Sequence, residues 1–362
     1  MVSESEVLAR LSKVMDPELG RDIVSLGMVR DLRVEGDRVS FVLELTTPAC
    51  PYNEQIISQA KASVHALPGV KTVDMRVTAR VPHGISAQGP LSTVRNVVAV
   101  ASGKGGVGKT TISVNLAVGL ARLGARTGIL DADIYGPNVP LMLRSQVKPT
   151  IVNRRVVPAV AHGVKVMSLG LFILDDSPLI WRGPMVANAV RQMLQDVEWG
   201  ELDYLIVDLP PGTGDAALTL AQTIPLTGVV IVTTPQDAAV GIATKALQMF
   251  RRLGIDIIGV VENMSQYVCP HCGKRDDVFG RGGGRRVAKE LDAWFLGEIP
   301  LNSRIRQQSD AGTPIVLTHA PEAAAFLELA KAVAARVSVL AYQRSRPEGQ
   351  KGRPESPWAP RF

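Results

Sequence analysis

The hydrophobic positions of the chain change their spacing at about residue 94. Beyond it, short runs that are apolar at every position alternate with stretches of helical periodicity. Strands that are apolar on both faces are typical of a parallel sheet covered by helices on both sides. The pattern therefore predicts an α/β fold with a mostly parallel sheet flanked by helices. The expected strands are residues 97–101, 127–130, 204–207, 229–232 and 257–261.

The residues before this point predict a small α+β domain. Two segments alternate between apolar and polar residues on either side of Glu35-Gly36-Asp37, which is a turn sequence, and this arrangement indicates a β-hairpin. Pro51 can start a helix. The expected elements are a helix over 7–14 with Leu8 and Leu11 inward, strands over 29–34 and 39–45, a helix over 51–66 and a strand over 70–77.

The composition along the chain predicts four segments. Residues 1–83 form the small domain, and residues 84–94, which are rich in Gly, Ser and Pro, form a linker. Residues 95–342 form the large domain, with a last helix over about 322–342. Residues 343–362 contain five Lys/Arg, two Asp/Glu and four prolines, and we expect a disordered basic tail. These prolines exclude a continuous amphipathic helix.

The overall composition is that of an ordinary globular protein, with 46% apolar and 20% charged residues. Half of the formal net charge of +6 lies in the tail, so we expect no nucleic-acid partner. No apolar run reaches the roughly 18 residues of a membrane span, and we expect no membrane partner. The first residues lack the apolar stretch of a signal peptide. Three cysteines are too few for a disulfide scaffold, so a reducing, cytoplasmic location is expected.

A glycine-rich segment between the first large-domain strand and a helix predicts a phosphate site. Its glycines allow backbone N–H groups to converge on phosphate oxygens, and the helix N-terminus adds its positive dipole end. We expect Lys109 to reach the β- and γ-phosphates of ATP and the Thr110 hydroxyl to bind Mg²⁺. The predicted nucleotide-binding residues of this segment are Gly103, Lys104, Gly105, Gly106, Val107, Gly108, Lys109, Thr110 and Thr111.

Two acidic motifs follow predicted strands of the same sheet. Ligands of open α/β sheets bind at the carboxyl ends of the strands. Asp208, in the motif 208–212, has the position of a Walker B carboxylate that contacts Mg²⁺ directly or through water. The Pro-Pro-Gly that follows indicates a stiff switch segment. Asp131-Ala132-Asp133 is either part of the site or a simple turn at a strand end.

Cys269 and Cys272 have the CxxC spacing that lets two thiolates bind one metal centre. A stable zinc or iron–sulfur site normally needs four ligands, and the chain has no second CxxC. A twofold homodimer would bring two copies of the pair together. Three interpretations remain open, namely a redox dithiol, a shared zinc and a bridging [4Fe–4S] cluster. We treat His271 as a spacer.

The segment 103–110 matches the deviant Walker A pattern GKGGxGK[ST] and resembles MinD, ParA, the nitrogenase iron protein and the Mrp/ApbC carriers. The resemblance implies an ATP-sandwiched homodimer in which Lys104 reaches the partner's nucleotide, much as an arginine finger does. It also implies that Asp133 positions the attacking water and that Asn263 bonds the purine edge. A turn or helix-cap role for Asn263 stays open.

Residues 95–342 as a whole resemble the Mrp/ApbC/Nbp family of iron–sulfur cluster carriers, and residues 1–83 resemble the SufT-like small domain. The family implies a slow ATPase that holds a labile [4Fe–4S] cluster at a homodimer interface and passes it to apo iron–sulfur proteins. The alternatives are a MinD/ParA-like positioning ATPase without a metal and a zinc-stapled metabolic ATPase. The large-domain segments that carry the resemblance are 103–110, 131–138, 181–185, 208–215, 262–264, 269–272 and 279–284.

Cys50, in the small-domain motif 47–51, is a further candidate thiol. It either contacts a metal or a partner transiently or is a half-buried small residue. A cysteine at a helix start can also have a lowered pKa.

Overall fold

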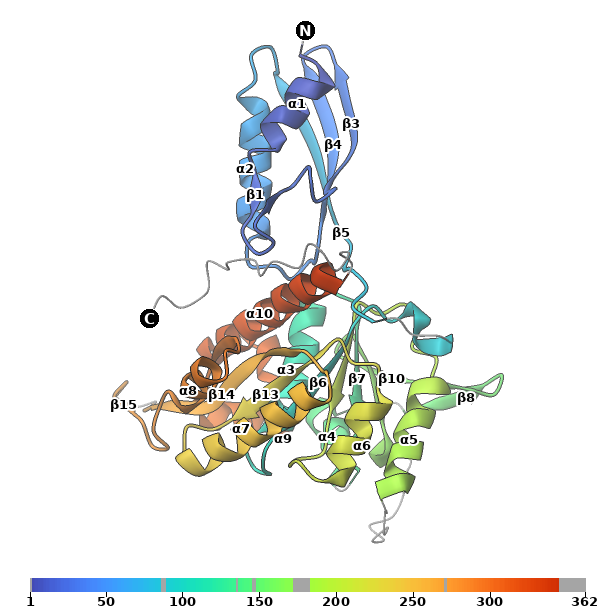
Figure 1. The fold of residues 1–362 in the computed structure, drawn as a ribbon, viewed down its shortest axis with the longest axis vertical. Coiled ribbons are helices and arrows are strands. Elements are labelled where there is room, and N and C mark those ends of the chain that lie inside the picture. Colours follow the sequence, from blue (N-terminus) through green and yellow to red (C-terminus); the bar gives the residue numbers. More distant parts are fainter. Residues whose placement is uncertain are drawn as a thin grey trace. The chain divides into compact units, whose positions relative to one another are not determined.

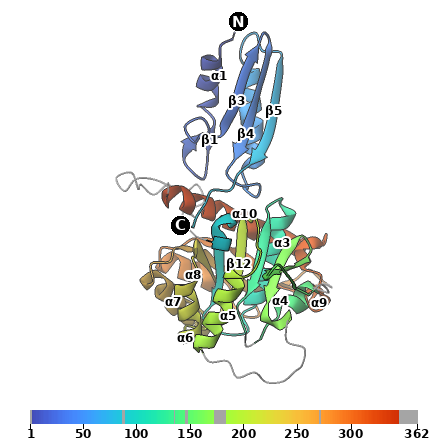
Figure 2. The ribbon, with the colours of Figure 1, turned by 90° about the vertical axis from the view of Figure 1, so that its right-hand side faces the viewer.

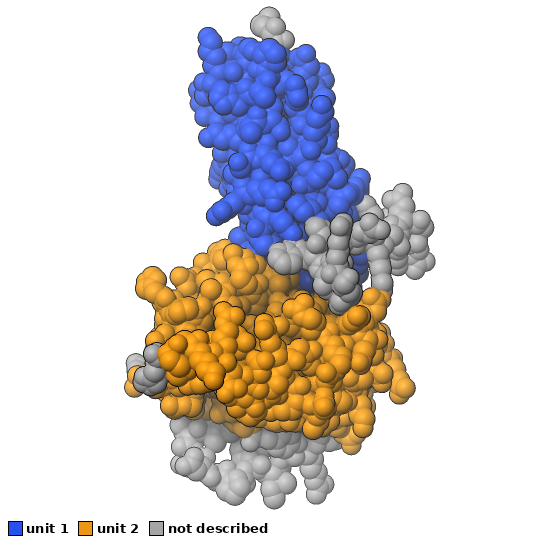
Figure 3. All heavy atoms as spheres, turned by 90° about the vertical axis from the view of Figure 1, so that its left-hand side faces the viewer, with its two compact units in different colours: residues 1–82, 334–362 blue, residues 83–333 orange. Residues whose placement is uncertain are grey.

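The computed structural model describes residues 2–85, 89–134, 136–144, 148–171, 183–269 and 272–344. The chain divides into two compact units, which Figure 3 shows in different colours. One unit comprises residues 1–82 and 334–362, and the other comprises residues 83–333. The last helix, α10 (Pro321–Arg344), therefore has residues in both units.

The first unit contains a three-stranded sheet in the order β3-β4-β5. β3 and β4 are antiparallel, whereas β5 runs parallel to β4. Figures 1 and 2 show α1 and α2 against one face of this sheet. The elements are α1 (Glu4–Leu11), the short pair β1 (Met15–Asp16) and β2 (Arg21–Asp22), β3 (Val29–Glu35), β4 (Arg38–Leu45), α2 (Asn53–His65) and β5 (Thr72–Ala79).

The position of α1 is set by a cap rather than by the apolar pattern. The Ser3 hydroxyl accepts the Glu6 N–H and the Glu6 carboxylate accepts the Ser3 N–H, so this capping box starts the helix at Glu4. The helix was predicted over residues 7–14, so the prediction lay too far toward the C-terminus of the chain. Val7 and Leu11, four residues apart, are the buried positions of α1, whereas Leu8 is half-buried.

The second unit is built on a nine-stranded sheet in the order β10-β11-β7-β12-β6-β13-β14-β15, with β16 also paired to β14. All its pairings are parallel except those of β10 and β15 at the edges. The predicted α/β fold with a small α+β unit is confirmed. The strands are β6 (Val97–Ser102), β7 (Thr127–Asp131), β10 (Ala159–Ala161), β11 (Val164–Ser168), β12 (Tyr204–Asp208), β13 (Gly228–Thr233), β14 (Ile257–Val268), β15 (Arg275–Asp276) and β16 (Phe295–Leu301).

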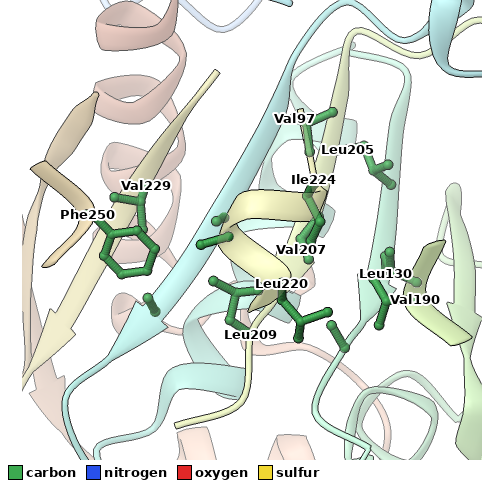
Figure 4. Close-up of a cluster of buried hydrophobic side chains, with 14 of the residues drawn as sticks. Val97, Leu130, Val190, Leu205, Val207, Leu209, Leu220, Ile224, Val229 and Phe250 are labelled. Atoms are coloured by element: carbon green, nitrogen blue, oxygen red, sulfur yellow. The ribbon is translucent and has the colours of Figure 1, made fainter. Parts of the chain in front are cut away.

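Helices cover both faces of this sheet (Figures 1 and 2). One interface packs apolar residues of α5, α6 and α7 onto the strands, and Figure 4 shows Leu220 and Phe250 among the strand residues Leu205, Val207 and Val229. α3 contacts β6, β7 and β12.

The other elements of this unit are the hairpin of β8 (Thr150–Val152) and β9 (Arg155–Val157) and a set of helices. These helices are α3 (Lys109–Arg122), α4 (Val139–Leu143), α5 (Gly183–Gln195), α6 (Asp215–Thr223), α7 (Asp237–Arg252), α8 (Gly283–Glu290) and α9 (Ser303–Asp310). No helix of the described residues is long and apolar enough to cross a membrane.

β14 is longer than the apolar run 257–261 predicts, because it continues to Val268. Two partners support the extra length. β16 pairs along it, and β15 forms an antiparallel hairpin with Tyr267 and Val268. Neither β16 nor β15 was predicted, since β15 has only two residues and β16 mixes polar with apolar positions. Asn263 consequently lies within the strand and not after it.

Buried acidic side chains surround Cys50 in the first unit. Burial and the charge of Asp16 raise the pKa of Glu18 to about 7. The Glu18 carboxyl group also forms a hydrogen bond with the Cys50 side chain. Burial and the Glu18 carboxylate raise the pKa of Cys50 well above its usual range. The suggestion that Cys50 has a lowered pKa because it stands at a helix start is therefore wrong. Desolvation raises the pKa by more than the helix N-terminus would lower it.

Glu18→Gln should flatten the dependence of the first unit's stability on pH. Folded Glu18 keeps its proton up to about pH 7 whereas the unfolded side chain loses it near 4.5, so the wild-type free energy of unfolding falls as the pH rises through this window. The fall is up to about 3 kcal/mol. Hydrogen exchange of β4 amides, corrected for the intrinsic rate at each pH, measures it. Glu54→Gln, an exposed position on α2, should keep the wild-type slope; equal slopes in all three proteins would contradict the assignment.

Candidate functional site

The loop between β6 and α3 has the backbone of a phosphate cradle. β6 ends at Ser102 and α3 begins at Lys109. Gly106 and Gly108 have φ of +79° and +81°, which favours glycine at both positions. A Cβ atom on Gly103 would lie 2.7 Å from the backbone carbon of Ile242 on α7. Conformation therefore favours glycine at two positions of the motif, and close packing requires it at Gly103, whereas Gly105 has neither constraint.

Four of the predicted site residues meet at the carboxyl ends of β6, β7 and β12. Lys109 Nζ lies 2.9 Å from Asp208 Oδ2 and 3.5 Å from Asp133 Oδ2. The Thr110 hydroxyl donates to Asp208 Oδ2 over 2.7 Å. Asp208 is fully buried, so these partners replace the water contacts that its carboxylate has lost. The cluster places a lysine, a hydroxyl and two carboxylates next to the cradle.

Ser113 belongs to this cluster but was not predicted. Its hydroxyl donates to Asp208 Oδ1 over 2.6 Å, so both oxygens of Asp208 accept a hydroxyl proton. Ser113 lies one helical turn after Lys109 and faces the sheet. The available signal was a small polar residue on the buried face of α3, which packing alone does not require.

Asp131 organises the segment that follows β7. Its carboxylate accepts the backbone N–H groups of Asp133 at 3.1 Å and Val139 at 3.2 Å, and the Ser168 hydroxyl at 3.2 Å. Burial and the neighbouring charge of Asp208 raise the pKa of Asp131 to about 7. Burial also raises the pKa of Asp133, and Lys109 opposes that shift. Asp131 thereby fixes the backbone that carries Asp133 toward Lys109.

Lys104 is placed differently from Lys109. It is half-buried on the loop, and its carbonyl accepts the Ser102 hydroxyl at 3.0 Å. Within the described parts of the chain, Lys104 forms no ion pair. The cluster of Lys109, Asp133 and Asp208 is therefore complete without it.

Asn263 reaches the cradle from β14. Its amide nitrogen donates to the Val107 carbonyl over 2.8 Å, and the residue is buried. The purine contact implied by the resemblance stays a prediction. The neighbouring Glu262, which was not predicted, is fully buried and accepts the N–H groups of Gly282 at 2.9 Å and Gly284 at 2.6 Å. It therefore fixes the start of α8 with a carboxylate, and the available signals were its position directly after an apolar run and its place in the segment 262–264.

The cysteine pair lies in the hairpin between β14 and β15, at an edge of the sheet. The Cys269 N–H donates to the Lys274 carbonyl, and the Gly273 N–H donates to the Cys269 carbonyl, both over 2.9 Å. Cys269 is half-buried and Cys272 is exposed. Val268, Val278 and Phe279 nearby expose at least 36% of their surface. Pro270 and His271, as well as Trp181 and Arg182 of the family motif, lie outside the described residues.

Among the described residues, no group of three or more His, Cys, Asp or Glu side chains could hold a metal ion. Cys269 and Cys272 are the two thiols that the described residues place at the hairpin.

Two family models match the chain. The model of the NUBPL iron-transfer P-loop NTPases of the ParA group matches residues 93–334, and that of the iron–sulfur cluster assembly proteins matches residues 4–75. An iron–sulfur cluster carrier protein of Synechocystis sp. is 46% identical over 94% of this chain and 99% of its own length. The carrier protein of Deinococcus radiodurans is 48% identical over 92% and 95%. The chloroplastic assembly factor HCF101 of Arabidopsis thaliana is 44% identical over 87% of this chain and 60% of its own.

Two solved structures are similar to this chain. A nucleotide-binding protein from Archaeoglobus fulgidus, determined in complex with ADP, is 39% identical, with a TM-score of 0.56 over 62% of this chain and 88% of its own. The cell-division ATPase MinD of Pyrococcus furiosus is 20% identical, with a TM-score of 0.51 over 66% and 98%, and shares the fold. The resemblance to the Mrp/ApbC/Nbp carriers is confirmed by these matches, and the chain belongs to the ParA/NUBPL family of iron-transfer P-loop NTPases.

Proposed function

We propose that this protein is an ATP-hydrolysing carrier that binds a labile [4Fe–4S] cluster at a homodimer interface and transfers it to apo iron–sulfur proteins. The observation that carries the proposal is the hairpin at the end of β14 with half-buried Cys269 and exposed Cys272, since β14 also contacts the P-loop through Asn263. The cluster is cargo in this proposal, and ATP is the resident ligand.

The nucleotide half of the proposal rests on the cradle and its oxygen ligands. Thr110 and Asp208 offer a hydroxyl and a carboxylate whose oxygens are 2.7 Å apart, and such hard oxygen donors fit Mg²⁺. Bound Mg²⁺ would neutralise charge on the β- and γ-phosphates. Lys109, now paired with Asp208 and Asp133, is positioned to exchange these carboxylates for phosphate oxygens. Asp133 would then be free to orient the attacking water.

The metal half of the proposal needs a second copy of the chain. Two thiols are half of a Cys₄ set, and a twofold axis at the hairpin supplies the other two. The exposed Val268, Val278 and Phe279 beside the cysteines are apolar surface that such an interface would bury. We infer that hydrolysis changes the dimer and thereby the hold on the cluster.

Anaerobic reconstitution with ferrous iron and sulfide tests the cluster assignment. Wild-type protein should bind about four iron and four sulfide per dimer and absorb in the visible range. Cysteine thiolates are the expected ligands, so Cys269→Ser should abolish the uptake, whereas Cys50→Ala should retain it because Cys50 is buried in the other unit. Equal iron uptake by Cys269→Ser and wild type would refute the carrier function, and tight zinc without iron would favour a structural metal.

Lys104→Ala should slow ATP hydrolysis on the order of 10³-fold while ATP still binds, because a lysine donated across a dimer acts only on the transferring phosphoryl group. Lys109→Ala should instead lose ATP binding. Steady-state kinetics measures hydrolysis, equilibrium titration measures ATP binding, and light scattering measures the oligomeric state. Lys245→Ala, an exposed lysine on α7, is the control and should behave as wild type. Wild-type hydrolysis by a strictly monomeric protein would exclude the shared site.

Asp133→Asn should lower the rate of hydrolysis by roughly 10²- to 10⁴-fold and leave ATP affinity near that of wild type. The amide keeps the shape of the side chain but cannot accept a proton from water. Single-turnover hydrolysis with excess protein separates this chemical step from product release. Asp237→Asn, at an exposed acidic position of α7, serves as the matched control. An unchanged rate constant for the Asp133 variant would exclude its role in activating water.

A further inference from the structure

The Asn263 side chain lies directly against one peptide unit of the phosphate cradle. Its amide nitrogen donates to the carbonyl of Val107 over 2.8 Å. A Cβ atom on the next residue, Gly108, would lie only 2.2 Å from the same nitrogen. Asn263 is 6% exposed, so its amide is packed in place. The contact therefore fixes the peptide that joins Val107 to Gly108.

The orientation of that peptide determines where its N–H group points. None of the described peptide bonds is cis, and in a trans peptide the C=O and N–H groups point in opposite directions. Because the Val107 carbonyl faces Asn263, the Gly108 N–H faces away from it. Backbone N–H groups of this loop are the ones that bind phosphate in P-loop proteins. A hydrogen bond to the carbonyl also polarises the N–H of the same unit.

We propose that Asn263 is a positioning residue that holds the Val107–Gly108 peptide with its N–H toward the phosphates, and that β14 links this peptide to the cysteine hairpin. The inference rests on the phosphate half of the proposed function and not on the cluster. It differs from a purine contact, because a purine contact would sense the base whereas this arrangement senses the phosphates.

The path from Asn263 to Cys269 follows one strand. Met264 has φ of +56°, a left-handed conformation that is unfavourable for a side chain of this kind and persists only where the surroundings impose it. The pairing of β14 with β16 is irregular between Asn263 and Tyr267. Tyr267 then pairs with Asp276 in the hairpin that carries Cys269. If the Val107–Gly108 peptide moves, Asn263 would transmit the movement to β14 next to the distorted backbone at Met264. From there the strand leads to the residue before Cys269.

Binding of ATP and of inorganic tripolyphosphate, which has no base, distinguishes the two roles. Isothermal titration of the full chain should show that Asn263→Ala weakens both ligands by roughly tenfold, as expected for the loss of one buried hydrogen bond. Ser265→Ala is the matched control, since Ser265 lies in the same strand as Asn263 and its buried hydroxyl donates to the Ile299 carbonyl of β16, away from the cradle. It should bind both ligands as wild type does. If Asn263→Ala weakens ATP but not tripolyphosphate, the residue contacts the base and the proposal is overturned.

Alkylation of the cysteines tests the link through β14. The rates at Cys269 and Cys272 are followed by peptide mass spectrometry, with and without saturating tripolyphosphate and without iron. In wild type and Ser265→Ala the ligand should change these rates, and in Asn263→Ala the rates should be the same with and without it. A preserved response in Asn263→Ala, or no response in wild type, would overturn the link.

One further measurement and one further variant keep these outcomes interpretable. Circular dichroism melting establishes that each variant is folded, and Asn263→Ser, whose hydroxyl is too short to reach Val107, provides a second variant should the alanine be unstable. Since iron is absent throughout, failure of the link is separate from failure of cluster binding, which the reconstitution experiment reports.

Discussion

The buried pairing of Lys109 with Asp208 is the interaction on which the site depends. Both side chains are almost completely removed from solvent, and a buried charge without its partner is strongly destabilising. Hydroxyls of Thr110 and Ser113 satisfy the Asp208 oxygens. In the proposed function, phosphate and magnesium would enter this cluster by replacing one set of opposite charges with another. The same requirement explains why the cradle, the carboxylate and the hydroxyls stand at one edge of the sheet.

The parallel sheet supplies this arrangement because all its central strands end on the same side. β6 delivers the cradle, β7 delivers Asp131 and Asp133, and β12 delivers Asp208. β14 contributes in a second way, since it passes the cradle at Asn263 and continues to the cysteine hairpin. One strand thereby connects the nucleotide half of the protein's proposed chemistry to the metal half. A carrier that uses ATP needs such a physical connection between two ligands of different kinds.

Local sequence patterns predicted some elements better than others. The predictions of β6, β7, β12 and β13 were correct because a strand buried on both faces is mostly apolar. β15 and β16 escaped prediction because their pairing with β14, and not their own composition, makes them strands. In the small unit, the capping box starts α1 about one helical turn before the position that the apolar spacing predicted.

The sequence by itself determined the fold class, the phosphate cradle and the spacing of the two thiols, because glycines, lysines and cysteines at fixed intervals permit few alternative chemistries. Three hydrogen bonds were decided only by the tertiary structure. The Ser113 hydroxyl donates to Asp208, Glu262 accepts the N–H of Gly282 at the start of α8, and Asn263 donates to the Val107 carbonyl of the cradle. The tertiary structure also showed that Cys50 is a buried thiol with a raised pKa. These facts depend on which residues distant in the chain come into contact and on how much water they lose, and neither quantity is encoded in a local motif.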